Sequence, residues 1–221
     1  MPSVRTVTID VVLPCLNEAA ALPWVLDRIP PGARAIVVDN GSNDGSAEVA
    51  RNHGATVVTA PERGYGAACH AGLLAATAPI VAMCDCDGSI DPSEVLGFVD
   101  VLDAGADLVV ARRRPVARAA WPVPLRLANA ELARRVRRRT GAALRDVGPL
   151  RVARREPLLG LQVGDRRSGY PVEVIVRAAQ AGWTIVGRDV AYAPRVGRSK
   201  VTGTLPGAVR AVVDMNRALT A

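Results

Sequence analysis

The stretch Ile80-Val81-Ala82-Met83-Cys84-Asp85-Cys86-Asp87-Gly88-Ser89 decides the fold of this chain. Its run of five apolar residues is typical of a strand that is buried on both faces of a parallel sheet. Two aspartates follow this strand, and the carboxyl edge of an open α/β sheet is where such proteins bind ligands. Neighbouring carboxylates repel each other, and a divalent hard cation such as Mg²⁺ or Mn²⁺ removes that cost. Asp-x-Asp-Gly is also common in acidic turns, so these residues alone leave both interpretations open.

Segments with strand and helix patterns alternate around this stretch. Strands that alternate with helices at this spacing form right-handed βαβ units. The pattern therefore predicts an α/β fold, with a mostly parallel central sheet flanked by helices. The expected strands are 4–13, 35–39, 56–59, 80–84 and 107–111, and the expected helices are 18–28, one from about residue 47, 64–77 and 91–102.

The second half of the chain is less regular. Three prolines interrupt residues 112–125, where no regular element is expected. Further on, helices are expected at 125–139, 173–181 and 206–219, and strands at 149–152 and 184–190. A chain of 221 residues suits one domain, with residues 1–111 as its α/β half and residues 112–221 as a basic C-terminal half.

Composition favours a cytoplasmic protein. Hydrophobic residues make up 49% of the chain, which is enough for a sizeable core. No apolar run reaches the roughly 18 residues of a membrane span, and the N-terminus has no apolar signal segment after a basic start. The four cysteines lack the spacing of a secreted disulfide framework, and the two histidines, His53 and His70, lie far from Cys84 and Cys86, so zinc is not expected. The cysteines are expected to be small buried thiols.

The net charge of +7 is concentrated in one region. Between Arg112 and Arg155 there are fourteen arginines and only two acids, Glu131 and Asp146. Such a patch attracts phosphates, anionic lipid headgroups or nucleic acid. Apart from Trp121 it lacks the interleaved aromatic side chains that stack on bases, so nucleic acid is not expected as a partner.

Three further segments would reach the same edge of the sheet as residues 80–89. Leu13-Pro14-Cys15-Leu16-Asn17-Glu18 closes the first strand. Val37-Val38-Asp39-Asn40-Gly41-Ser42-Asn43-Asp44-Gly45-Ser46 closes the second, and its polar side chains can cap the following helix. Arg63-Gly64-Tyr65-Gly66-Ala67-Ala68 opens the third helix. All four segments would meet in one crevice.

Together these segments resemble the family 2 glycosyltransferases of GT-A fold, whose nucleotide-sugar-binding sheet is Rossmann-like. The family's marks are a proline-x-x-asparagine-glutamate start, a Val-x-Asp-x-Ser-x-Asp turn, a Gly-x-Gly helix start and an Asp-x-Asp metal motif. The resemblance continues through residues 108–112, 146–148, 170–173 and 194–201 and so covers nearly the whole chain. Order and spacing are most similar to the dolichyl- or polyprenyl-phosphate sugar synthases, in the form without appended membrane helices.

The resemblance implies that residues 1–111 bind a nucleotide-sugar. Asp39 would accept a hydrogen bond from the base or ribose, and Gly64 and Gly66 would let the N–H groups of a helix N-terminus approach the nucleotide. Asp87, with Asp85, would hold the Mg²⁺ or Mn²⁺ ion that neutralises the departing nucleoside diphosphate. The implied nucleotide-sugar site consists of Pro14, Asn17, Glu18, Asp39, Gly64, Gly66, Asp85 and Cys86.

Some positions depart from the family pattern or have a second interpretation. Asn40 stands where relatives often carry a second aspartate, and Ser89 where polyprenyl-phosphate relatives often carry glutamine. Glu18 also suits simple charge complementarity at a helix start. Glu173 matches an acidic family position near the active site, and it equally suits a helix N-terminus.

The resemblance implies that residues 112–221 bind the acceptor. A phosphate monoester is already a nucleophile at pH 7, so transfer to it needs cations that hold one anion beside another rather than a strong base. The implied acceptor-phosphate residues are Arg112 and Arg126, with a late basic loop of Arg195, Arg198, Ser199 and Lys200. The implied catalytic residues are Asp85, Asp87, Arg112 and Lys200, the single lysine of the chain.

The expected activity is metal-dependent, inverting transfer of a hexose from a nucleotide-sugar of the UDP-glucose or GDP-mannose type to polyprenyl or dolichyl phosphate. The alternatives are a soluble acceptor, such as a phosphorylated metabolite or a natural product, and, less favoured, a nucleotidyltransferase. Helix 125–139 would either insert its apolar face into the cytoplasmic side of the membrane, as a peripheral contact, or pack on the core. The sequence leaves the sugar, the base and the oligomeric state open.

Overall fold

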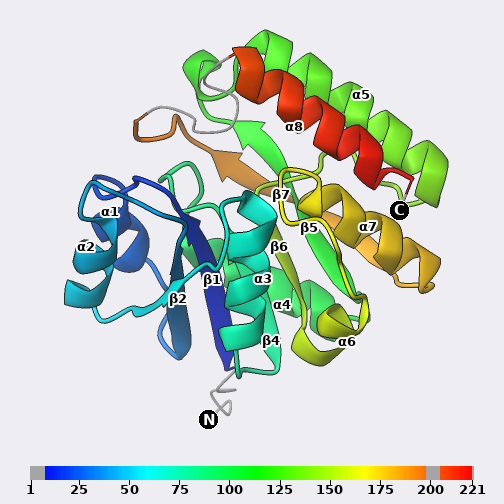
Figure 1. The fold of residues 1–221 in the computed structure, drawn as a ribbon. Helices are drawn as coiled ribbons and strands as arrows, with labels where there is room; N and C mark the ends of the chain where they lie inside the picture. The colour runs from blue at the N-terminus through cyan, green and yellow to red at the C-terminus, as the bar shows by residue number, and fades with distance from the viewer. Residues whose placement is uncertain (1–7, 198–204, 221) are drawn as a thin grey trace.

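The computed structural model describes residues 8–197 and 205–220. Its centre is one seven-stranded sheet with the strand order β3-β2-β1-β4-β6-β5-β7 (Figure 1). Neighbouring strands are parallel except at β6, which is antiparallel to both β4 and β5. The predicted α/β fold with a mostly parallel sheet is therefore confirmed. The strands are β1 (Ile9–Cys15), β2 (Ala33–Asp39), β3 (Thr56–Thr59), β4 (Ile80–Cys84), β5 (Leu108–Pro115), β6 (Leu150–Arg154) and β7 (Ile185–Tyr192).

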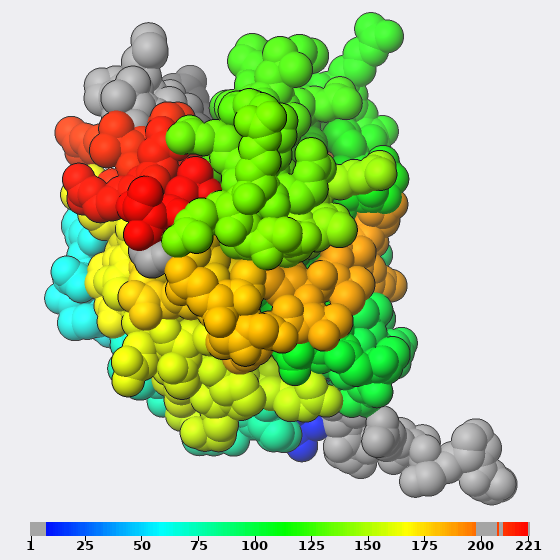
Figure 2. All heavy atoms as spheres, turned by 90° about the vertical axis from the view of Figure 1, so that its right-hand side faces the viewer, coloured from blue at the N-terminus to red at the C-terminus, as the bar shows by residue number. Residues whose placement is uncertain are grey.

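Helices cover both faces of the sheet. One face carries α1 (Leu22–Leu26), α2 (Ser46–Asn52) and α4 (Val95–Asp103), the last preceded by the 3₁₀ turn Pro92–Glu94. The other face carries α3 (Tyr65–Ala75), α6 (Arg155–Gly160) and α7 (Tyr170–Gln180). Two more helices, α5 (Val123–Thr140) and α8 (Leu205–Ala218), pack on α7 and lie side by side (Figures 1 and 2). Among the described residues, no helix is both long enough and apolar enough to cross a bilayer.

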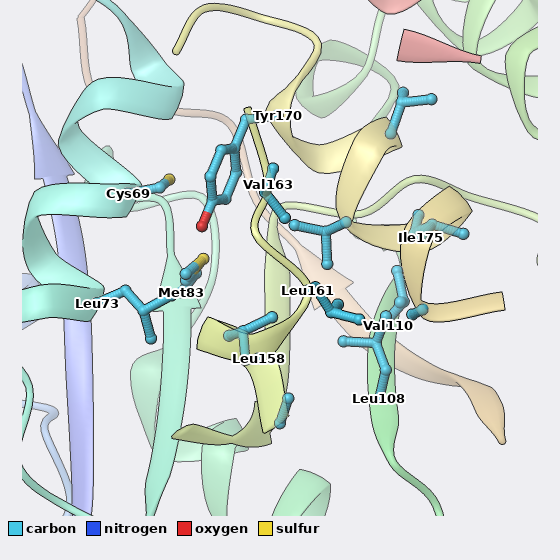
Figure 3. Packing of buried hydrophobic residues seen from close by; sticks show 14 of the residues in the cluster. Cys69, Leu73, Met83, Leu108, Val110, Leu158, Leu161, Val163, Tyr170 and Ile175 are labelled. Atoms are coloured by element: carbon cyan, nitrogen blue, oxygen red, sulfur yellow. The ribbon is translucent and has the colours of Figure 1, made fainter. Parts of the chain in front are cut away.

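The two cores follow from strand periodicity, because successive side chains of a strand point to opposite faces. In β4, Val81 and Met83 belong to the core beneath α3 and α7, whereas Ile80, Ala82 and Cys84 belong to the core beneath α1 and α4. Burial on both faces explains the uninterrupted apolar run of this strand. Figure 3 shows Met83 among residues of three helices, namely Cys69 and Leu73 of α3, Leu158 of α6 and Tyr170 of α7.

The first half of the chain follows the prediction closely, except at α1. The strands β3 and β4 begin and end at the predicted residues. The predicted helix 18–28 is wrong at both ends, because α1 spans only Leu22–Leu26. The backbone N–H groups of Glu18 and Ala19 donate to the side chains of Ser46 (2.9 Å) and Asp44 (3.0 Å). These bonds hold the chain in a turn, so the helix begins later.

The prediction of no regular element in residues 112–125 is wrong. The strand β5 continues to Pro115, because it pairs with β7 in register from Leu108 opposite Ile185 to Pro115 opposite Tyr192. A short 3₁₀ turn (Arg118–Ala120) then leads into α5. The boundary drawn at residue 111 therefore falls inside a strand, and β6 of the second half lies between β4 and β5 of the first. Both halves share one sheet, as expected for a single domain.

The helix α6 was not predicted. It follows β6 directly and has only six residues, which is too short to display a helical hydrophobic period.

The second half of α5 packs on the core, with Ala133 and Val136 buried. For this part of the helix, the core alternative is the one observed. All four cysteines are buried free thiols, as predicted.

Asp10 connects β1 to β2 and to the segment before β4 at the amino edge of the sheet. It is buried at 1% exposure on β1, and its carboxylate accepts hydrogen bonds from the N–H groups of Thr77 (2.6 Å) and Ala78 (2.9 Å) and from Arg34 (2.7 and 2.8 Å). Burial alone would raise the pKa of Asp10, but the bonds from Arg34, Ala78 and Thr77 outweigh it and lower the pKa. The charged form is therefore stabilised by folding.

We expect Asp10→Asn to lower the free energy of unfolding at pH 7 by about 1–3 kcal/mol, because the charge-assisted bonds are weakened. The native pKa lies below the unfolded value of about 3.9, so the contribution is present above pH 4 and is lost as the pH falls further. Urea unfolding of the variant and the wild type between pH 7 and 3 measures the difference in their free energies of unfolding. This difference should become smaller as the pH falls. Exposed Asp27→Asn is the control, and a difference that stays constant with pH would contradict the assignment.

Candidate active site

Asp85 and Asp87 follow β4 at the carboxyl edge of the sheet. Asp87 is 5% exposed; its Oδ1 accepts the N–H of Ser89 (2.9 Å), and its carbonyl accepts the N–H of Val196 (2.8 Å). Asp85 is partly buried, and its N–H donates to the carbonyl of Pro149 (3.1 Å). The two acids thus lie on backbone that is tied to the segment before β6 and to the segment after β7.

The carboxylate of Asp85 is only partly compensated by its surroundings. Burial raises the pKa of Asp85 to about 6, and the charge of Asp87 acts in the same direction. Arg151 and the hydroxyl of Tyr65, which donates to Oδ1 of Asp85 (3.1 Å), oppose this rise. Burial and Asp85 hold the pKa of Tyr65 well above its usual range, so Tyr65 remains a donor. An added cation beside this pair would be favourable.

The donor set suits Mg²⁺ or Mn²⁺. Carboxylate oxygens are hard ligands, and Mg²⁺ is typically held by one or two carboxylates, with substrate phosphates and water at its remaining positions. In the part of the chain that the structure describes, no group of three or more His, Cys, Asp or Glu side chains forms a complete metal site. Asp85 and Asp87 fit a cation that reaches them together with a phosphate-bearing substrate.

Arg195 joins both sides of the crevice. Its Nη2 lies 3.0 Å from Oε1 of Glu18 after β1 and 3.3 Å from Oδ2 of Asp87 after β4. Its Nε is buried and makes no hydrogen bond with a described residue. The structure therefore brings together three residues that the sequence analysis assigned to different parts of the site. Glu18 is buried in an ion pair rather than placed only for charge complementarity at a helix start.

The loop after β1 is fastened to the loop after β2. The N–H of Asn17 donates to Oγ of Ser42 (2.9 Å), and Oδ1 of Asn17 accepts the N–H of Asn43 (2.8 Å). Asn17 has a φ of +56°, a left-handed conformation that asparagine adopts more readily than most residues. Asp39, at the end of β2, accepts the N–H of Ser42 at Oδ1 (3.0 Å). The predicted base-binding residues Asn17 and Asp39 thus form one connected wall.

Asn40 has a structural role that explains its departure from the family pattern. It is 7% exposed, its Nδ2 donates to the carbonyl of Glu62 (2.7 Å), and its Oδ1 accepts the N–H of Gly64 (2.8 Å). An aspartate could accept the second bond but could not donate the first. Asn40 therefore holds the segment before α3 against the end of β2.

The structure gives Gly64 and Gly66 a different role from the predicted one. The N–H groups of Gly66 and Ala67 already donate to the carbonyls of Arg167 (3.0 Å) and Arg166 (2.8 Å). A Cβ at Gly64 would lie 2.1 Å from the carbonyl oxygen of Arg166. These glycines permit close approach of the 165–167 backbone, and the first turn of α3 does not offer these N–H groups to a nucleotide.

Arg112 is engaged away from the two acids. Its Nη2 donates to Oδ2 of Asp189 on β7 (2.7 Å), and Arg114 donates to the same carboxylate (2.7 Å). The bonds from Arg112 and Arg114 lower the pKa of Asp189 to about 2. The predicted catalytic and phosphate-binding role of Arg112 therefore does not match its contacts, which link β5 to β7.

Arg113 takes the position expected of Arg112, because neighbouring strand residues point to opposite faces. Its Nη2 donates to Oδ1 of buried Asp146 (2.7 Å) and to Oδ1 of Asn129 on α5 (3.0 Å). The guanidinium also lies 3.9 Å from the ring centroid of Trp121, a cation–π contact. Its charge lowers the pKa of Asp85, and the guanidinium also lies 5.5 Å from the ring centroid of Tyr192 on β7.

The remaining predicted residues divide into four groups. Arg126 is exposed on α5 and forms no ion pair within the described residues. Cys86 is buried, and its thiol donates to the carbonyl of Pro14 (3.0 Å), so these two residues shape the site from beneath. Glu173 accepts the N–H groups of Gly164 (2.9 Å) and Asp165 (2.6 Å) and thereby supports the loop that contacts α3. Arg198, Ser199 and Lys200 lie outside the described residues.

Sequence reasoning missed Tyr65, Arg113, Asp146 and Arg151 as members of the site. Arg151 carried a usable signal, because a charged residue inside the apolar strand Leu150–Arg154 is rarely buried without a partner. Its Nη2 donates to the carbonyl of Val147 (2.8 Å), and its Nη1 donates to the hydroxyl of Tyr65 (3.5 Å). Choosing between Arg112 and Arg113 required the register of β5 with β7, which cannot be deduced from the sequence pattern.

Sequence comparisons agree with this geometry. The model of glycosyl transferase family 2 matches residues 10–160 of the chain. An uncharacterized glycosyltransferase of Mycobacterium tuberculosis is 55% identical, over 93% of this chain and 95% of the relative. A dolichyl-phosphate hexose transferase of Haloferax volcanii is 32% identical, over 90% of this chain and 88% of the relative.

A solved structure shares the fold. Glucosyl-3-phosphoglycerate synthase from Mycobacterium tuberculosis, crystallised with Mn²⁺, UDP and glucosyl-3-phosphoglycerate, has a TM-score of 0.75 and 26% sequence identity. The match covers 96% of this chain and 78% of that one. The α/β architecture is thus the GT-A fold. With its fold, its paired acids after β4 and the family match over most of its length, the chain belongs to glycosyl transferase family 2 and is a glycosyltransferase.

Proposed function

We propose that this glycosyltransferase moves a hexose from a nucleotide-sugar to the phosphate of a polyprenyl or dolichyl lipid, at the cytoplasmic face of the membrane. The observation that carries the proposal is the set of arginines around Asp85 and Asp87. Arg113, Arg151 and Arg195 come from β5, from β6 and from the segment after β7. The donor diphosphate and the acceptor phosphate are both anions, and holding them side by side needs such a concentration of positive charge. The likeness to a dolichyl-phosphate hexose transferase supports a lipid phosphate as the acceptor.

On the donor side, Asp85 and Asp87 would hold Mg²⁺ or Mn²⁺. When bound, the ion supplies a Lewis acid that neutralises charge on the departing diphosphate. Asp39 and the loop around Asn17 would face the base and ribose. Arg195 adds a cation beside Asp87 that would also attract the diphosphate.

On the acceptor side, an oxygen of the phosphate monoester forms a bond to the anomeric carbon. The bond from that carbon to the diphosphate oxygen breaks, and the nucleoside diphosphate leaves with the electron pair. The attacking oxygen is ionised at pH 7, so no residue has to remove a proton. Attack opposite the leaving group inverts the anomeric configuration. Arg113 would position the acceptor phosphate, while Asp146 and Asn129 fix the orientation of its guanidinium.

A soluble phosphorylated acceptor is the second candidate. The fold match to glucosyl-3-phosphoglycerate synthase covers nearly the whole chain. The phosphate of a soluble phosphorylated carboxylic acid would use the same arginines, so the geometry around Asp85 suits both acceptors. Only the part of the acceptor beyond the phosphate separates the two candidates.

We expect sugar transfer from one nucleotide-sugar into a polyprenyl phosphate, with loss of transfer in Asp87→Asn by at least about a hundredfold, because the metal ligand and the partner of Arg195 are both removed. The measurement pairs radiolabelled UDP-glucose, GDP-mannose and related donors with a short-chain polyprenyl phosphate or with 3-phosphoglycerate, in Mn²⁺ or Mg²⁺. Label in 3-phosphoglycerate alone would select the soluble acceptor. Label in neither, with any donor, would overturn the proposal.

The metal site has a signature in stability. The pKa of Asp85, about 6 in the folded protein, lies above the unfolded value of about 3.9, so ionised Asp85 lowers stability above pH 6 and has no such effect below pH 4. Without divalent cations, Asp85→Asn should therefore raise the free energy of unfolding at pH 7.5 by about 2 kcal/mol and leave it unchanged near pH 4.

Denaturant unfolding in EDTA and in Mn²⁺ measures both parts of this prediction. Mn²⁺ with UDP should stabilise the wild type and should fail to stabilise Asp85→Asn. Exposed Asp100→Asn on α4 is the matched control and should behave like the wild type. A variant that is less stable than the wild type at pH 7.5 would refute the interpretation of Asp85.

Arg112 and Arg113 offer a matched pair for the acceptor site. Arg113→Lys keeps the charge but loses the bidentate geometry, so the KM for the phosphate acceptor should rise by about tenfold or more. Arg112→Lys should change it by less than about threefold, because Arg112 pairs with Asp189. Initial rates at saturating donor measure both. Equal effects of the two substitutions on this KM would contradict the assignment of the acceptor phosphate to Arg113 alone.

A further inference from the structure

Exposed apolar side chains occur between the end of β5 and the first turns of α5, and we name this set the α5 tip: Val116, Val123, Leu125 and Leu127. Their exposed fractions are 64%, 62%, 39% and 66%. All residues from 122 to 128 are exposed, including Leu125 and Leu127, which lie on opposite sides of a helix of 3.6 residues per turn. This part of α5 therefore projects beyond the body of the protein, whereas Ala133 and Val136 further along pack on the core.

The charge around the α5 tip has one sign. Residues 112–130 contain five arginines and no acid. Arg118 and Arg126 are exposed, and neither forms an ion pair with a described residue. Exposed valines and leucines flanked by unpaired arginines are what an anionic bilayer binds, with apolar side chains among the acyl chains and guanidinium groups on the lipid phosphates.

This charge pattern argues against a second copy of the chain as the occupant. In a two-fold dimer the same patch meets itself, so Arg118 and Arg126 would face like charges and no acid from residues 112–130. A membrane with anionic headgroups supplies the missing negative charge.

The α5 tip is connected to the active site through Arg113. Trp121, just before α5, stacks on the guanidinium of Arg113 at 3.9 Å, and Asn129 accepts a hydrogen bond from it at 3.0 Å. Trp121 and Asn129, which lie before and after tip residues 123–127, thus both contact the proposed acceptor-phosphate arginine. α5 extends along the upper side of the molecule in Figure 1, the side toward which the carboxyl end of the sheet points.

We propose that the α5 tip inserts into the headgroup region of an anionic membrane and thereby places Arg113 at the depth of a lipid phosphate. The proposal rests on the proposed function for the identity of the acceptor, but membrane binding itself requires no catalysis. The insertion is peripheral, because only the first part of the helix is free of contacts with the core.

Vesicle co-sedimentation tests the surface without reference to activity. The wild type should bind vesicles of phosphatidylcholine with about one third phosphatidylglycerol, bind pure phosphatidylcholine much more weakly, and release in about 0.5 M salt. The double variant Val123→Ser/Leu127→Ser should bind the anionic vesicles at least about tenfold more weakly, because two apolar side chains no longer transfer out of water. The control Leu74→Ser/Leu96→Ser removes equally apolar exposed residues from α3 and α4 and should bind like the wild type.

Three outcomes would overturn the proposal. These are no binding by the wild type, equal binding by the tip and control variants, and a concentration-dependent dimer that the tip variant abolishes. Transfer to a short-chain polyprenyl phosphate in solution separates this proposal from the proposed function. Transfer in solution without vesicle binding would refute only the membrane insertion of the α5 tip. Vesicle binding without transfer to any acceptor would refute only the proposed function. Melting temperatures confirm that both double variants are folded.

Discussion

The architecture of the active site depends on one electrostatic constraint, the placement of two carboxylates at the end of a buried strand. Asp85 and Asp87 are held close together, because only one residue separates them and their backbone is bonded to Pro149 and Val196. The chain balances them with Arg151, Arg113 and Arg195, each supplied by a later element. The balance is incomplete at Asp85, whose pKa stays near 6. A cation that arrives with a substrate therefore gains the interaction energy that the protein's own arginines leave unused.

The antiparallel strand β6 makes this balance geometrically feasible. Because β6 runs against its neighbours, its first residue, Leu150, pairs with Cys84, the last residue of β4. The segment before β6 therefore lies at the carboxyl edge, where Pro149 accepts the N–H of Asp85 and Asp146 holds Arg113. A parallel strand in the same position would enter from the opposite edge and bring that segment to the wrong side of the sheet.

The sequence was sufficient for the features that depend on local pattern. Strands buried on both faces, such as β4, have continuous apolar runs, and the acids that follow them identify the edge of the sheet. The sequence was insufficient for features that depend on the pairing of strands far apart in the chain. The extension of β5 to Pro115 needs β7, and a shift of one residue in that register would exchange the faces of Arg112 and Arg113. The glycines of α3 match a phosphate-binding pattern, yet they are required by a contact with Arg166, about a hundred residues later.

Arg195 bridges Glu18 and Asp87, two acids from the first half of the chain, and it comes from the last third. The two halves of the chain are therefore not exchangeable modules. A chimaera that kept residues 1–111 and took its second half from a relative would retain every donor motif. It would also remove the cation that bridges Glu18 and Asp87 unless the new half carried an arginine at the same point after its last strand.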